Sequence, residues 1–203
     1  SGEVVDLTDR RVQMLWPSMG QLGTRLLAGF SEAQGIRSVA LPEPDFHTAS
    51  RARAVASGKE CIPSLLVLGS FLDWFANNEI DPERVYVLFM PLTTGPCRTG
   101  QYAIFYENLF RELGYKNVLC LSLNSDNSYT ELGTDWSKNA MVGIYFSDMI
   151  RDIRNSIRAL AQDPAAGLAV LDKIEKEAVE CSQKGVQGIW KNLPLWADRL
   201  AAI

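Results

Sequence analysis

The first 130 residues alternate short apolar runs with stretches whose apolar residues recur at helical spacing. The strand candidates are residues 11–17, 36–41, 84–90 and 117–123. The helix candidates between them are residues 22–30, 61–77 and 98–113. Parallel neighbours need a crossover helix, and the connections here are short, so this order predicts a Rossmann-like α/β fold. We expect a doubly wound parallel sheet with helices on both faces.

The last third of the chain has a different pattern. A polar, turn-rich stretch at residues 124–133 precedes three apolar helical stripes. The stripes predict a long helix through Val142, Phe146, Met149, Ile153, Ile157 and Leu160, a second from Pro164 to Gly185, and a short piece at residues 190–200. We therefore predict a Rossmann-like domain at residues 1–130 and a C-terminal α-helical extension at residues 131–203. These helices should bury their stripes against the α/β body or another chain.

Composition narrows the class of protein. With 203 residues and 47% hydrophobic content, the chain can bury a full core. Its net charge of −4, with basic residues spread along the chain, argues against a nucleic-acid partner. The apolar stretches are too short for a membrane span, and no signal peptide opens the sequence. Four cysteines are too few for a disulfide scaffold, which favours a cytoplasmic location. The start at Ser1-Gly2, without Met, indicates a piece of a longer protein.

Two cysteines lie where helices are expected to begin, each just after a Gly/Pro turn. Cys61 opens the stripe at residues 61–77, and Cys97 follows the strand candidate at residues 84–90. Unpaired N–H groups and the positive end of a helix favour thiolate over thiol. Because ligands bind beyond the carboxyl ends of parallel strands, we expect the two sulfur atoms to lie close together there. The pattern indicates a soft-metal or iron–sulfur site.

Three strings of residues resemble a known family. They are Pro44-Asp45, Gly58-Lys59-Glu60-Cys61-x-Pro63 and Gly95-Pro96-Cys97-Arg98-x-Gly100-Gln101-Tyr102. They are similar to the cysteine motifs of the 2-hydroxyacyl-CoA dehydratase superfamily. The closest branch is that of the CoA-substrate-specific enzyme activases, related to the double-cubane cluster proteins. The resemblance covers roughly residues 11–130, and the last string is its most specific part.

The resemblance implies a function. In this family, cysteines of Rossmann-like domains hold a cubane [4Fe-4S]-type cluster, and an activator ATPase injects a low-potential electron into it. The electron then reduces a CoA thioester or another small substrate. Carried over by motif, Cys61 and Cys97 become cluster ligands. Gly95, Pro96, Arg98, Gly100 and Gln101 would surround the cofactor, with Arg98 offsetting its negative charge.

The remaining cysteines leave the ligand set open. Cys120 lies inside an apolar strand and Cys181 on an apolar helical stripe, where core packing is the simpler interpretation. Either Cys120 or Cys181 is a third ligand, or the third ligand lies outside this chain, or the chain alone holds no intact cluster. Zinc motifs use close pairs of cysteines, and thioredoxin-like chemistry needs C-x-x-C; the sequence has neither. The single histidine, His47, is expected in a loop.

Two other functions compete with an iron–sulfur component. In the first, the same crevice holds CoA or another small anion without a cluster. In the second, the helical extension docks an activator ATPase or a sister Rossmann-like domain, or a second copy of the chain. An enzymatic activity of the chain itself is left open.

Overall fold

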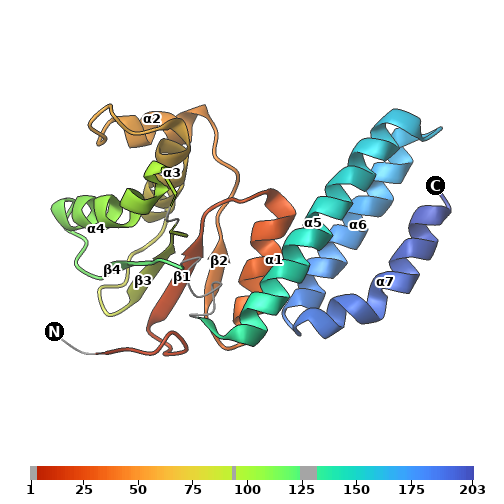
Figure 1. The fold of residues 1–203 in the computed structure, drawn as a ribbon, viewed down its shortest axis with the longest axis horizontal. Helices are drawn as coiled ribbons and strands as arrows, with labels where there is room; N and C mark the ends of the chain where they lie inside the picture. The colour runs from red at the N-terminus through yellow and green to blue at the C-terminus, as the bar shows by residue number, and fades with distance from the viewer. Residues whose placement is uncertain (1–3, 93–94, 124–131) are drawn as a thin grey trace.

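The computed structural model describes residues 4–92, 95–123 and 132–203. It contains a sheet of four parallel strands in the order β2-β1-β3-β4 (Figure 1). The strands are β1 (Val12–Trp16), β2 (Ser38–Ala40), β3 (Val85–Phe89) and β4 (Val118–Leu121). All four overlap the predicted runs, which confirms the Rossmann-like α/β class.

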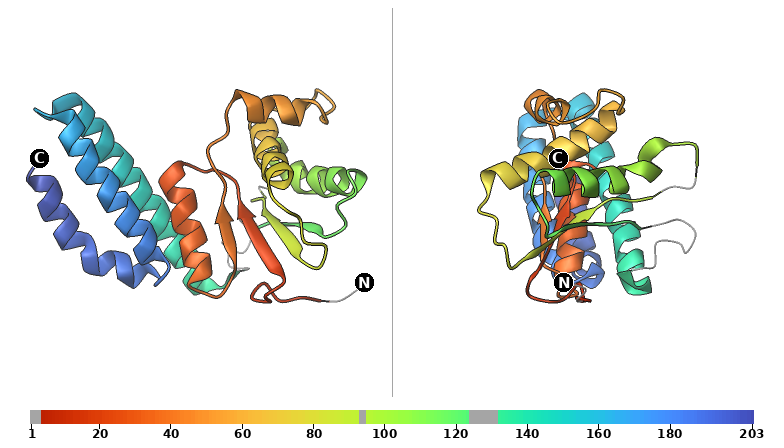
Figure 2. Two further views of the ribbon diagram at one scale, coloured as in Figure 1. Left: turned by 180° about the vertical axis from the view of Figure 1, so that it is seen from behind. Right: turned by 90° about the vertical axis from the view of Figure 1, so that its left-hand side faces the viewer.

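Helices cover both faces of this sheet. Helices α3 (Ile62–Asn77) and α4 (Tyr102–Glu112) pack on one face, and α1 (Gln21–Glu32) and the start of α5 (Thr134–Leu160) pack on the other (Figures 1 and 2). In β3, Tyr86 and Leu88 face α3 and α4, whereas Val87 and Phe89 face α1 and α5. Successive side chains of a strand point to opposite faces, so a strand covered on both sides is apolar throughout.

Helix α2 (Phe46–Arg53) was not predicted from the sequence. His47 lies in its first turn, so the expectation of a loop there is wrong. The helix begins with a capping box, in which Asp45 Oδ1 accepts from the Thr48 backbone N–H at 2.9 Å and Thr48 Oγ1 accepts from the Asp45 N–H at 3.3 Å. These bonds satisfy two backbone donors. They stabilise the start of a short helix whose apolar pattern is weak.

The C-terminal helices form a third layer beyond α1. They are α5, α6 (Pro164–Ser182) and α7 (Val186–Ala201), and they share a core cluster with α1 (Figure 1). The first turns of α5 also reach the sheet, where Trp136 stacks on Trp16 with ring centroids 5.6 Å apart. The extension therefore packs against the α/β body, as expected from its stripes. Most of the predicted boundary, residues 124–131, lies outside the described residues.

Helix α4 faces the core with a different set of residues from the one its apolar spacing indicates. Ile104, Phe105, Leu109 and Leu113 form a stripe in the sequence, but Ile104 and Leu113 are 61% and 43% exposed. A short 3-10 helix, η1 (Arg98–Gln101), precedes α4. The buried residues of α4 are Tyr102, Ala103, Tyr106, Leu109 and Phe110. Two tyrosines thus form part of the core face.

Candidate functional site

The two cysteine segments meet at the carboxyl edge of the sheet. Cys61 is the N-cap residue of α3, which returns from β2 toward β3, and Cys97 is the N-cap residue of η1, which follows β3. Strands β1 and β3 are adjacent, while β2 and β4 lie on their outer sides. This reversal of strand order is a topological switch point, where open α/β sheets bind ligands.

Two contacts join the segments directly. Arg98 Nη1 donates a hydrogen bond to the Lys59 carbonyl oxygen at 2.6 Å. The Tyr102 hydroxyl contacts Cys61 Sγ. The Cys97 segment therefore contacts the Cys61 segment at two points, the Lys59 carbonyl oxygen and the Cys61 sulfur. Sequence spacing predicts that both segments reach this edge, but it does not reveal either contact.

The conformation of the loop before α3 determines where Cys61 lies. Gly58 has a φ of 84°, a left-handed conformation that residues with a side chain rarely adopt. The Glu60 carboxylate accepts hydrogen bonds from the backbone N–H groups of Ser57 at 3.1 Å and Gly58 at 3.0 Å. Pro63 lies in the first turn of α3, and Cys61 makes no side-chain capping bond. Its half-exposed sulfur thus stays available beside the first N–H groups of the helix.

Cys97 is the most accessible of the four cysteines. Its side chain is exposed, and its sulfur lies 3.0 Å from Thr99 Oγ1. Hydrogen bonds from the Thr99 hydroxyl and backbone N–H, together with the charge of Arg98, lower the pKa of the Cys97 thiol. An exposed thiol with a lowered pKa is a reactive nucleophile and a good metal ligand.

Tyr102 connects the exposed site to the core. Its side chain is buried, and burial, followed by the hydrogen bond to Cys61, raises the pKa of the Tyr102 hydroxyl to about 12. Smaller contributions to this pKa come from the charges of Cys61 and Cys97, which raise it, and of Arg98, which lowers it. The Tyr102 hydroxyl therefore stays protonated at neutral pH and can donate.

The other predicted site residues belong to the second segment. Gly95, Pro96, Arg98 and Gln101 are exposed, and Gly100 is half-buried. Arg98 already donates to the Lys59 carbonyl, so it acts as a tie between the segments as well as a positive charge beside Cys97. Tyr102, the last residue of the second motif, also joins the two segments through its contact with Cys61.

The two remaining cysteines pack against different core clusters. Cys120 packs in β4 against the core below α4, and burial, with the charge of Glu107, raises its pKa to about 12. Cys181 lies in the core cluster of α1, α5, α6 and α7, where Asn192 Nδ2 donates to its sulfur at 3.4 Å. Both cysteines thus fill core positions in separate parts of the fold.

The described residues do not form a complete site for an iron–sulfur cluster. Cysteine thiolates are the usual ligands of such clusters, normally four for a cubane. This edge of the sheet offers Cys61 and Cys97, and within the described part of the chain no group of three or more His, Cys, Asp or Glu is arranged to hold a metal ion. A cubane bound here would therefore need ligands from outside these residues.

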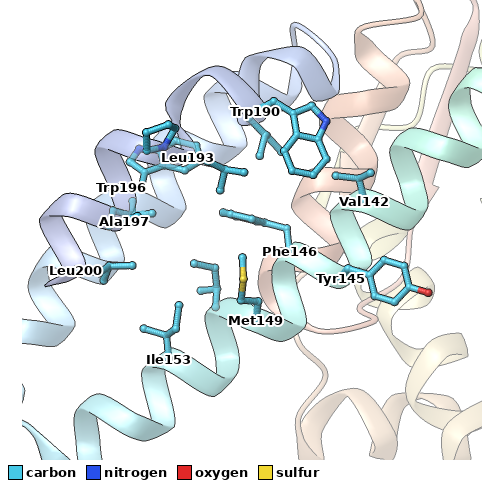
Figure 3. Close-up of a pocket in the computed structure, with 14 residues that line it drawn as sticks. Val142, Tyr145, Phe146, Met149, Ile153, Trp190, Leu193, Trp196, Ala197 and Leu200 are labelled. Carbon is cyan, nitrogen blue, oxygen red and sulfur yellow. The ribbon is translucent and has the colours of Figure 1, made fainter.

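A large cavity lies elsewhere, in the helical extension. A groove of 810 Å³ opens between α5 and α7 and is lined almost entirely by apolar side chains (Figure 3). Phe146 and Met149 of α5 face Leu193 and Trp196 of α7 across it, and Trp190 stands at its rim (Figure 3). Met149 is 45% exposed, although its stripe predicts a core position. In the sequence, this groove corresponds to an apolar stripe on α5 that is too wide for one neighbouring helix to cover.

Fold and site together define an α/β protein of Rossmann-like topology with paired cysteine segments at its switch point. The comparisons with known proteins identify no relative: no model of a protein family, no curated protein and no solved structure matches the chain. Among the helices of the described residues, none is both long and apolar enough to cross a bilayer.

Proposed function

We propose that this chain is a domain of an ATP-activated iron–sulfur reductase or dehydratase component. Cys61 and Cys97 hold part of a cubane [4Fe-4S]-type cluster at the carboxyl edge of the sheet. The observation that carries the proposal is the meeting of two separate cysteine segments at the switch point through Arg98 and Tyr102. The resemblance of these segments to the 2-hydroxyacyl-CoA dehydratase superfamily supports the same assignment.

The residues of the chain have distinct tasks in this function. Cys61 and Cys97 supply thiolates, and the lowered pKa of Cys97 favours its deprotonated form. Arg98 brings a positive charge beside a site that gathers negative charge, and it keeps the two segments together. A bound cluster would supply a low-potential electron for the reduction of a CoA thioester or another small substrate.

The cluster ligands that this chain lacks indicate what kind of partner it needs. Two thiolates complete half of a four-thiolate set, so a sister Rossmann-like domain or a second copy of the chain must supply the rest. The exposed side chain of Cys97 and the exposed Gly95 and Pro96 leave the site open toward such a partner. An activator ATPase, as domain or separate protein, would deliver the electron.

Anaerobic reconstitution of the whole protein with iron and sulfide tests this function. We expect the broad visible absorbance of a cluster to appear and to persist through desalting. A colourless protein that binds CoA in a calorimetric titration would contradict the proposal and favour the cluster-free binding module. A colourless protein that binds neither would contradict both.

The groove between α5 and α7 favours a second candidate function. An 810 Å³ apolar groove with half-exposed Met149 and Trp190 at its edges has the character of an interaction surface. In this function the helical extension binds the same helices of a second copy of the chain. The resulting dimer would contain two cysteine sites.

Sedimentation velocity tests the docking function. Wild-type protein should sediment as a dimer, and Met149→Asp should sediment as a monomer because it places a charge in the groove. Lys138→Asp is a matched control, since this exposed residue of the same helix does not line the groove. A monomeric wild type would contradict the docking function and leave the iron–sulfur assignment unaffected.

A further inference from the structure

We propose that Glu107 closes the open edge of the sheet: its carboxylate occupies the backbone N–H of Cys120 and so keeps β4 from pairing with β4 of a second copy of the chain. The device is an intramolecular contact that competes with strand addition. It goes beyond the iron–sulfur assignment and does not depend on it, because it involves no metal at the cysteine segments.

Strand β4 has one side without a neighbour. It is the last strand of the order β2-β1-β3-β4, so among the described residues no strand lies on its outer side. The carbonyl oxygens of Asn117 and Leu121 accept hydrogen bonds at 2.8 and 2.9 Å from backbone N–H groups of β3 and of the residue after it. Successive residues of a strand direct their backbone groups to opposite sides. Val118, Cys120 and Ser122 therefore present their N–H and C=O groups to the outer side.

The sequence of this edge favours pairing with another strand. Residues 117–123 contain no charged residue, no proline and no glycine. Leu119, in the middle of the strand, is 53% exposed. Apolar edge strands with these properties are the segments through which proteins associate strand by strand. A second copy carries the same apolar edge, and two identical edges can pair around a two-fold axis. The fold therefore needs a device that blocks this pairing.

Helix α4 supplies that device. It packs over β4, and its half-buried Glu107 reaches the outer edge, where Oε1 accepts a hydrogen bond from the Cys120 N–H at 2.8 Å (Figure 1). Cys120 is the middle one of the three outward-facing residues, so an added strand would need this donor. The carbonyl of such a strand would have to displace a carboxylate, and a hydrogen bond to a charged acceptor is about twice as strong as a neutral one. The contact therefore favours the unpaired edge.

Replacing Glu107 by alanine tests the device because it removes the carboxylate and leaves β4 unchanged. Glu112→Ala is the matched control, since Glu112 is an exposed glutamate of the same helix. Both variants are made in the full chain together with Met149→Asp, so that association through the groove between α5 and α7 does not contribute. In sedimentation velocity we expect the Glu107→Ala protein to form a dimer whose fraction rises with concentration. The Glu112→Ala protein should stay monomeric.

Amide hydrogen exchange of the wild type gives a second readout, which does not require the variant to fold. The Cys120 N–H should exchange at least about 10-fold more slowly than its intrinsic rate in an unstructured chain, because a hydrogen bond to a charged group protects it although it lies on the outer edge. If circular dichroism shows that Glu107→Ala does not fold, this rate decides the question, and an unprotected Cys120 amide would overturn the proposal.

The sedimentation results can also overturn it. A folded Glu107→Ala protein that stays monomeric would show that the carboxylate does not hold the edge closed. Equal association of the Glu107→Ala and Glu112→Ala proteins would show that the effect is not specific to the Cys120 contact. Neither result depends on iron, so both leave the proposed function unaffected.

Discussion

The four cysteines differ most in what surrounds their sulfur atoms. Cys97 is exposed beside a threonine hydroxyl and an arginine, and Cys61 is half-exposed beneath a tyrosine hydroxyl. Cys120 is packed among apolar side chains, and Cys181 faces an asparagine amide in the helical core. The sequence distinguishes the first two by their Gly/Pro turns and the last two by their apolar neighbours. It cannot reveal Tyr102 as a partner of Cys61, because that contact depends on how α3 and α4 pack.

These surroundings predict unequal thiol reactivity. At pH 7.5 iodoacetamide should modify Cys97 at least about 100-fold faster than Cys120, since only a thiolate attacks, and Cys120 is half-buried with its pKa raised to about 12. Because the pKa of Cys97 is lowered, its rate should reach a plateau at a lower pH than that of an ordinary cysteine. Peptide mass spectrometry of timed samples measures both rates.

The Thr99 hydroxyl is the first cause of the lowered pKa of Cys97. Thr99→Val keeps the shape of this side chain and removes the donor, so the variant should need a higher pH for the same Cys97 rate. An unchanged pH profile in Thr99→Val, or a Cys120 rate equal to that of Cys97, would contradict this description of the site.

At the scale of elements, strands were easier to predict than the exact faces of helices. Strands covered on both sides are largely apolar, so β3, and β1 with Gln13 as its one polar residue, stand out in the sequence. The core face of α4 differs from the predicted one because the buried tyrosines Tyr102 and Tyr106 lie on it, whereas Ile104 and Leu113 are exposed. Helix α2 was missed because its capping box, rather than an apolar stripe, marks its start.

The packing of α2 on α3 depends on the absence of a side chain at Gly69. A Cβ atom there would collide with the Thr48 carbonyl of α2. In an exposed helix Gly→Ala stabilises by about 1 kcal/mol, but here the clash should prevail, and Gly69→Ala should lower the free energy of unfolding by about 1–3 kcal/mol.

Urea denaturation followed by circular dichroism measures this change. Ala76→Ser is the control, because Ala76 is exposed on the same helix and its substitution should stay within about 0.5 kcal/mol of wild type. A Gly69→Ala protein more stable than wild type would show that α2 does not pack closely on α3.

For the whole molecule, the start of the helical extension packs on one face of the sheet and on α1. Trp136 at the start of α5 is buried, stacks on Trp16 of β1 and donates from Nε1 to Ser31 Oγ of α1 at 3.0 Å. The sequence pattern changes after residue 130 from alternating strands and helices to helices alone, and this change predicts a helical extension beside the α/β domain. Only the packing shows that α5 belongs to two core clusters, one against the sheet and one within the helical layer.

This shared core predicts cooperative unfolding. Trp136→Ala should lower the free energy of unfolding by about 3–5 kcal/mol, the usual cost of removing a large buried aromatic side chain. The strand and helix layers should still unfold in one transition. Far-ultraviolet circular dichroism and tryptophan fluorescence should therefore give coincident urea curves in wild type and variant. Two separated transitions in the wild type would contradict the shared core.

The central claim is that Cys97, and not merely any cysteine of the chain, holds iron. The most direct measurement is iron content per chain in Cys97→Ser and Cys120→Ser, both reconstituted anaerobically in the whole protein. Serine keeps the size of the side chain but lacks the soft sulfur that iron prefers. We predict that Cys97→Ser keeps its melting temperature and loses its iron, whereas Cys120→Ser keeps its iron and loses about 1–3 kcal/mol of stability by burying a hydroxyl. Full iron loading of Cys97→Ser would contradict the account.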